Sequence, residues 1–218
     1  MELIFKICLI LHIIGGTLGI ACGTINTIRK KGDKTHKLVG KIFLYGLLTA
    51  GFMSLILAQI HPNAFLFIIG IFTIFLVGTG QRYLSLKQFA HGQKPLLIDW
   101  ILTIMMLVSG IAFMLYGGYF ILHQEIFGIV YIVFGAVGLY YVLKDFNYYK
   151  GQKIKVKNYW LMEHIGRMMA GFIASLTALL VVNGQYFSFM PPALLWLLPT
   201  IVLVPLIVYW SKKYVVKL

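Results

Sequence analysis

The chain has 218 residues, of which 60% are hydrophobic and 11% are charged, and its formal net charge is +13. This composition excludes a soluble globular domain of ordinary type, in which about 25% of residues are charged. It also argues against a nucleic-acid-binding protein, because the basic residues are divided among short connections between apolar stretches and form no separate basic domain.

Seven apolar stretches follow one another along the chain, each about long enough to cross the hydrocarbon core of a bilayer as a helix. The sequence therefore predicts an all-α fold, a single integral membrane domain built as a bundle of seven transmembrane helices. The fifth stretch is the shortest. The expected spans are 5–28, 38–60, 64–86, 96–122, 126–143, 160–182 and 193–210.

Basic residues mark alternate connections between these spans. Eighteen of the nineteen Lys and Arg residues fall within 29–41, 82–94, 144–167 and 212–217. Because short basic loops stay in the cytoplasm, this pattern predicts an N-terminus outside and a cytoplasmic C-terminus. The expected partners of the basic loops are the anionic lipids of the inner leaflet.

Small residues recur at four-residue spacing on the first span, at Gly15, Gly19 and Gly23. Such a ladder allows helix backbones to approach closely in lipid. It predicts tight packing inside the bundle, and the alternative is a contact between two copies in a homo-oligomer.

One group of ionisable residues lies near the basic side of the predicted spans. Glu163 and Arg167 are four residues apart and can pair along one helix face, and Asp99 can pair with Arg82 or Arg167 across the bundle. Such a network can hold a propionate or phosphate, or relay protons, whereas the simpler alternative is a set of paired interfacial charges. The members are His36, Arg82, Asp99, Glu163, His164 and Arg167.

A second group lies near the other side and contains His12, His61 and His123. These three residues are candidate ligands of a transition metal if their helices are neighbours. His12 lies about 10 Å below the surface, and it can instead be a neutral imidazole bonded to an adjacent helix or a proton-relay group.

Histidines at matched depth also suggest haem b. A bis-histidine haem needs two imidazoles on facing helices, with cationic groups near its propionates. His36 and His164 meet the depth condition, and His12 belongs to a second candidate pair. Arg82, Asp99 and Arg167 are expected either to support the ligand histidines or to contact the propionates. The arrangement resembles two-haem b-type membrane cytochromes, although those proteins hold their histidines deeper within the helices.

Two short motifs resemble a family of bacterial membrane proteins known as the domain of unknown function twenty-three-oh-six. They are the sequence that begins at His12 and continues through Gly15-Gly16, and the sequence from Thr35-His36 to Phe43. The segment 163–169 fits the same type of protein. The resemblance implies a multi-spanning helical protein of the bacterial cytoplasmic membrane, and no particular reaction. The functional hypotheses are therefore a haem- or metal-binding redox or assembly protein, a small-solute or proton-coupled transporter, and a non-catalytic scaffold.

Overall fold

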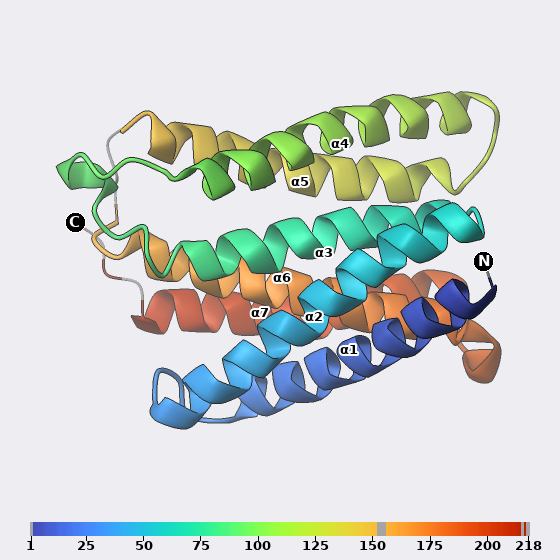
Figure 1. The fold of residues 1–218 in the computed structure, drawn as a ribbon, viewed down its shortest axis with the longest axis horizontal. Coiled ribbons are helices and arrows are strands. Elements are labelled where there is room, and N and C mark those ends of the chain that lie inside the picture. Colours follow the sequence, from blue (N-terminus) through green and yellow to red (C-terminus); the bar gives the residue numbers. More distant parts are fainter. Residues whose placement is uncertain (1, 152–155, 215, 217–218) are drawn as a thin grey trace.

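A computed structural model describes residues 2–151, 156–214 and 216. It confirms the predicted all-helical fold, with seven helices long and apolar enough to cross a membrane (Figure 1). The helices are α1 (Glu2–Ile28), α2 (Lys34–Ile60), α3 (Ala64–Arg82), α4 (Leu97–Leu122), α5 (Gly128–Tyr149), α6 (Tyr159–Val182) and α7 (Pro192–Tyr214).

Side-chain caps define where two of the helices begin. The Asp33 carboxylate accepts a 2.6 Å hydrogen bond from the backbone amide of His36 and starts α2. The Asn63 side chain accepts a 2.9 Å bond from the amide of Leu66 and starts α3. Each cap satisfies one of the amides that lack a partner at a helix N-terminus. The connections before α2 and α3 are short as a result, and both helices return directly along the bundle.

Four predicted boundaries differ from the structure by four residues or more. Helix α2 begins at Lys34 instead of 38, and α7 ends at Tyr214 instead of 210. The fifth span was expected to end at residue 143, whereas α5 continues to Tyr149 because Asp145 is buried against polar partners from other helices. The third span was expected to reach residue 86, whereas α3 ends at Arg82 and the chain turns there. Tyr83, directly after the helix, is fully buried, so this turn is part of the packed interior.

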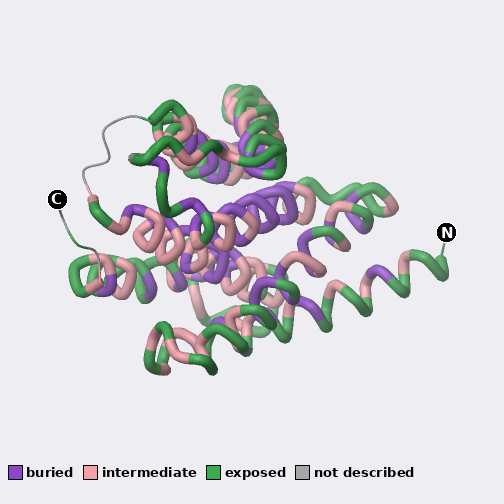
Figure 2. Tube along the Cα trace, turned by 60° about the vertical axis from the view of Figure 1, so that its left-hand side comes forward, coloured by how far each residue is buried: buried purple, intermediate pink, exposed green. Residues whose placement is uncertain are grey.

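Helix α3 forms the centre of the bundle. In its most apolar stretch 67% of the residues are buried, compared with 17% for α1. Figure 2 shows buried residues along α3, whereas α1 is exposed over most of its length. Helices α2, α6 and α4 pack against α3, and α7 packs against α6. The bundle therefore surrounds one central helix.

Two hairpins flank this centre, α1 with α2 and α4 with α5, and glycines bring the helices of each hairpin together. A Cβ atom on Gly46 of α2 would lie 2.7 Å from the Gly15 carbonyl oxygen of α1, and one on Gly128 would lie 2.7 Å from the Gly117 carbonyl oxygen. Only glycine allows so close an approach. The packing predicted for Gly15 and Gly19 is confirmed within a single chain, and a homo-oligomer stays a prediction.

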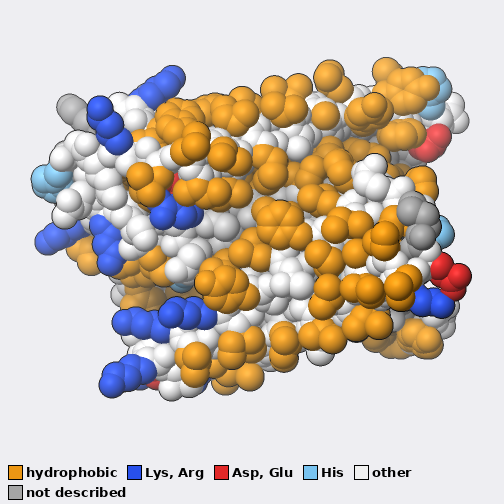
Figure 3. Space-filling view, viewed as in Figure 1, with side chains coloured by type: hydrophobic (Ala, Val, Ile, Leu, Met, Phe, Trp, Pro, Cys, Tyr) orange, Lys and Arg blue, Asp and Glu red, His pale blue; other side chains and the backbone are white. Residues whose placement is uncertain are grey.

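Charged residues are separated along the bundle. Figure 3 shows Lys and Arg side chains gathered at one end, which we call the basic end, with hydrophobic side chains covering the face that leads away from it. The basic end contains the α1–α2 connection, the segment between α3 and α4, the start of α6 and the end of α7. This separation agrees with the charge pattern of the sequence.

Candidate functional site

A buried ion network joins α5 to α6 near the basic end. The Arg167 guanidinium donates to Asp145 at 2.6 and 3.2 Å and to Glu163 at 3.3 Å, and all three side chains are completely buried. Lys144 forms a further ion pair with Glu163. Two cations therefore face two carboxylates, and the network carries no net charge.

Hydroxyl groups complete the bonds of this network. Tyr83 donates to Asp145 at 2.5 Å and Thr103 donates to the other carboxylate oxygen at 3.2 Å. Arg167 also donates to the Thr79 hydroxyl at 2.8 Å. These partners lie on or directly after α3 and on α4, so the network connects four helices. Buried charges are tolerated when their bonds are satisfied in this way, and the network is a structural connection.

A second ion pair closes the gap between α3 and α4. Arg82 donates to both oxygens of Asp99, at 2.6 and 3.0 Å, and Asp99 also accepts the backbone amide of Leu96 at 2.8 Å. The predicted Arg82–Asp99 and Glu163–Arg167 pairs are both confirmed. None of these four residues lines the large cavity described next.

Asp145 is the important polar residue that the sequence analysis missed. It was placed beyond the end of the fifth span and was not considered. The sequence did contain a signal, since Asp145 continues the buried helix face of Phe134, Gly138 and Val142.

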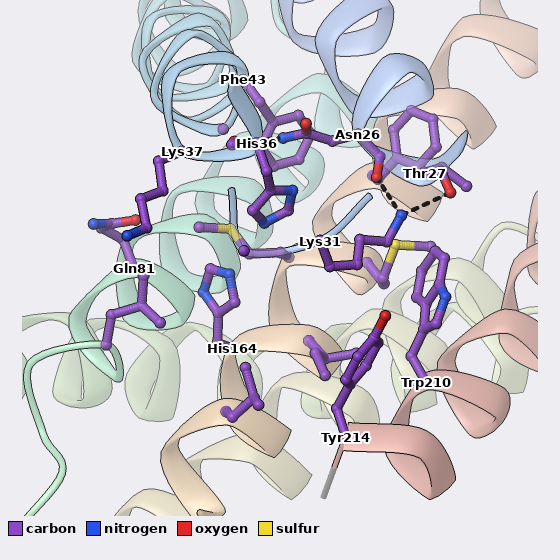
Figure 4. Close-up of a pocket in the computed structure, with 18 of the residues that line it drawn as sticks. Asn26, Thr27, Lys31, His36, Lys37, Phe43, Gln81, His164, Trp210 and Tyr214 are labelled. Carbon is purple, nitrogen blue, oxygen red and sulfur yellow. Dashed lines mark hydrogen bonds between the residues drawn. The ribbon is translucent and has the colours of Figure 1, made fainter. Parts of the chain in front are cut away.

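A cavity of about 630 Å³ lies at the basic end, between the α1–α2 hairpin and helices α3, α6 and α7 (Figure 4). Its wall is mainly apolar and includes Phe43, Met168, Phe172 and Trp210. His36 of α2 and His164 of α6 also line it, and Figure 4 shows their two imidazoles turned toward one another. The structure thus brings together the two histidines that the sequence placed at one depth.

The His164 imidazole is held in one tautomer. Its Nδ1 lies 2.9 Å from the Gly80 carbonyl oxygen, which can only accept a hydrogen bond. Nδ1 must therefore carry the proton, and Nε2 of the neutral ring keeps its lone pair. Histidines that bind metals usually donate their other N–H to a carbonyl or carboxylate in this manner. His164 consequently has the bonding expected of a ligand.

Two other polar atoms of the cavity wall have no hydrogen-bond partner among the described residues. They are Nδ1 of His36 and Oδ1 of Asn26, both buried. The Asn26 amide nitrogen donates to the His36 carbonyl oxygen at 3.2 Å, so the two residues are adjacent. Buried polar atoms are nearly always paired in native proteins, so two unpaired atoms on adjacent residues distinguish this wall from the fully bonded ion network.

The lysines at the cavity differ in their bonding. Lys31 donates to the carbonyl oxygens of Asn26, Thr27 and Arg29 at 2.5 to 3.0 Å and lies 4.2 Å from the Trp210 ring centre. Burial, and then the charge of Arg29, lowers the pKa of Lys31.

Three more lysines, Lys37, Lys41 and Lys87, line the cavity and form no ion pair with a described carboxylate. No Asp or Glu is among the lining residues. The cavity wall therefore carries an excess of positive charge.

The histidines at the opposite end are not brought together. His12 of α1 bonds the Ala50 carbonyl oxygen of α2 at 2.9 Å, and His61 packs edge-on against Phe5. His123 directly follows α4, in the other hairpin, where its Nδ1 bonds the Tyr119 carbonyl oxygen. Among the described residues, no group of three or more His, Cys, Asp or Glu side chains is placed to hold a metal ion.

No protein-family model, curated protein or solved structure matches the chain. The predicted family resemblance therefore stays a prediction, and the argument for function depends on the cavity.

Proposed function

We propose that this membrane protein binds haem b in the basic-end cavity, with His164 as an axial ligand and His36 facing it from α2, and acts in redox chemistry or cofactor assembly. One observation carries the proposal. His36 and His164, from separate helices, line the same cavity, and the Gly80 carbonyl fixes His164 with its Nε2 lone pair available. This is the arrangement that an imidazole ligand of iron requires.

The size and chemistry of the cavity support a flat apolar ligand. Its volume of about 630 Å³ falls within the range of about 300–1,000 Å³ that is usual for cofactor sites. Aromatic rings and the thioethers of Met168 and Met169 supply the contact surface, and methionine side chains adapt readily to irregular ligand faces.

The protein's own residues would prepare the site rather than carry the reaction. Bound haem would supply one-electron chemistry at its iron. The Gly80 carbonyl orients the His164 ring, and the apolar wall limits water. Hydrogen bonding to a ligand and burial in an apolar wall both affect the redox potential of a bound haem.

The position of the cavity favours chemistry at one membrane face. Helix α6 has 24 residues, about 36 Å at 1.5 Å per residue, and its residues that line the cavity lie between Trp160 and Phe172, toward the basic end. The described histidines at the opposite end do not form a second pair. We therefore place cofactor exchange or electron transfer at the basic end, which the positive-inside pattern assigns to the cytoplasmic face of a bacterial membrane in contact with anionic lipids.

Absorption spectroscopy tests this proposal. Protein purified in detergent from haem-supplemented cells should show a Soret band that shifts when dithionite reduces the sample. His164→Ala should lose the bound haem, His36→Ala should lose it or change its spectrum, and His123→Ala should match the unchanged protein because His123 lies on the α4–α5 hairpin. A spectrum without a Soret band would reject haem binding, and an unchanged spectrum in His164→Ala would reject the ligand assignment. Circular dichroism of each variant checks that the helices are retained.

A further inference from the structure

We infer that Lys37, Lys41 and Lys87 bind the acidic side groups of the ligand, so that the cavity selects a porphyrin with free carboxylates over the same macrocycle without them. This inference rests on the proposed function, because it concerns the same cavity and assigns the part of the ligand that the histidines do not contact.

The three lysines line the cavity from two separate elements of the chain. Lys37 and Lys41 are four residues apart on α2, and residues at this spacing lie on the same helix face. Lys87 comes from the segment after α3, where its ammonium group lies 4.4 Å from the ring centre of Trp160. Two elements distant in the sequence therefore direct positive charge to the same cavity.

The other cations near the cavity are already engaged. Arg82 is bonded to Asp99, and Arg167 is bonded to Asp145 and Glu163. Lys31 is bonded to three backbone carbonyl oxygens. Arg82 and Arg167, for which contact with the propionates was one of two expected roles, do not line the cavity. Lys37, Lys41 and Lys87 have neither an ion pair nor a backbone hydrogen bond of this kind among the described residues, so they are the cations left for an anionic ligand.

The chemistry of the wall narrows the ligand class. An apolar cavity with lysines and no acidic lining residue fits a molecule that has a hydrophobic body and carboxylates at one edge. Carboxylates bonded by ammonium groups form charge-assisted hydrogen bonds, which are stronger than neutral ones. Haem b and metal-free protoporphyrin IX share this chemistry, whereas a porphyrin diester has the body without the charges.

Titration of the purified protein with two metal-free porphyrins tests the inference directly. Protoporphyrin IX and its dimethyl ester differ only in the two carboxylates, and neither contains iron. The titrations are carried out in a neutral detergent, and the change in porphyrin fluorescence on binding gives the affinity of the protein for each porphyrin. We expect the free acid to bind at least about tenfold more tightly than the ester, since one hydrogen bond to a charged group corresponds to roughly that factor.

A matched pair of triple variants locates the effect. Lys37→Gln/Lys41→Gln/Lys87→Gln should reduce the affinity for the free acid to that for the ester. Lys30→Gln/Lys34→Gln/Lys94→Gln removes the same total charge from lysines that do not line the cavity, and it should keep the preference for the free acid. Both triple variants replace lysines that make no described ion pair, so circular dichroism should show unchanged helix content.

The outcomes separate this inference from the proposed function. If haem binds through His164 but the free acid and the ester bind equally, the lysine assignment is wrong and haem binding stands. If both triple variants lose the same amount of affinity for the free acid, the lysine assignment is also wrong, because general attraction to a basic surface would explain the result. If neither porphyrin nor haem binds, both proposals fail.

Discussion

The buried ion network around Arg167 and the cavity between His36 and His164 lie at the same end of the bundle, but they differ in whether their polar groups have bonding partners. In the network, Arg167, Asp145 and Glu163 are completely buried and bonded to one another and to hydroxyl groups. At the cavity, buried atoms of His36 and Asn26 lack partners, and lysines face an apolar wall.

The difference shows which polar residues are candidates for function. Ionisable residues inside a membrane protein attract functional interpretations by default, and the charges of the network were the natural candidates. Their complete pairing identifies them as connections between helices. The cavity, where buried polar atoms and three lysines lack such partners in the described part of the chain, is the better candidate for a ligand site.

The largest effect should come from breaking the network. Arg167→Met leaves the Asp145 carboxylate buried without its cation, and we expect the free energy of unfolding to fall by about 3–5 kcal/mol. Denaturation of the detergent-solubilised protein, followed by circular dichroism, measures the change. Arg167→Met/Asp145→Leu removes both charges and should recover part of the loss. A single variant within about 1 kcal/mol of the unchanged protein would show that the network is not a structural connection.

An intermediate effect is expected at the edge of the same region. Asp99→Asn removes the charged partner of Arg82, but the Arg82 side chain is 24% exposed and can be hydrated instead. The free energy of unfolding should fall by about 1–2 kcal/mol in the same denaturation experiment. A loss as large as that of Arg167→Met would contradict the distinction between the fully buried network and this pair, in which only the Arg82 side chain reaches solvent.

The smallest effect should come from the cavity. His36→Leu removes a buried nitrogen without a partner, so the unfolding free energy of haem-free protein should stay within about 0.5 kcal/mol of the unchanged value or rise. The matched variant His164→Leu breaks the bond to Gly80 and should cost about 1 kcal/mol. Denaturation of both variants provides the comparison. If His36→Leu costs as much as His164→Leu, the His36 ring has a structural role that its hydrogen bonds do not reveal.

Much of the fold was predictable because the length of an apolar span and the charge of a loop can both be recognised in a short stretch of sequence. Apolar length identified all seven spans, and the short spacing between Glu163 and Arg167 was sufficient to predict their pair. Matched depth also placed His36 and His164 at one side before their helices were known to share a cavity.

What the sequence could not provide was the set of neighbouring helices. His123 was grouped with His12 and His61 by depth, but α4 packs against α3 and α5, whereas α1 and α2 form the other hairpin. Asp145 was missed because hydropathy falls near the end of a span, whereas the helix continues when a buried partner such as Arg167 satisfies the charge. Both errors come from tertiary contacts that local patterns do not contain.

The glycine contacts between α1 and α2 have a consequence for biosynthesis. Five residues connect the two helices, and the close approach of Gly15 to Gly46 needs no other part of the chain. Because neighbouring segments pair quickly and domains form as the chain is made, this hairpin can assemble in the bilayer before the ribosome has completed α3. The central helix then meets a preformed wall, and the cavity is completed only when α6 and α7 arrive.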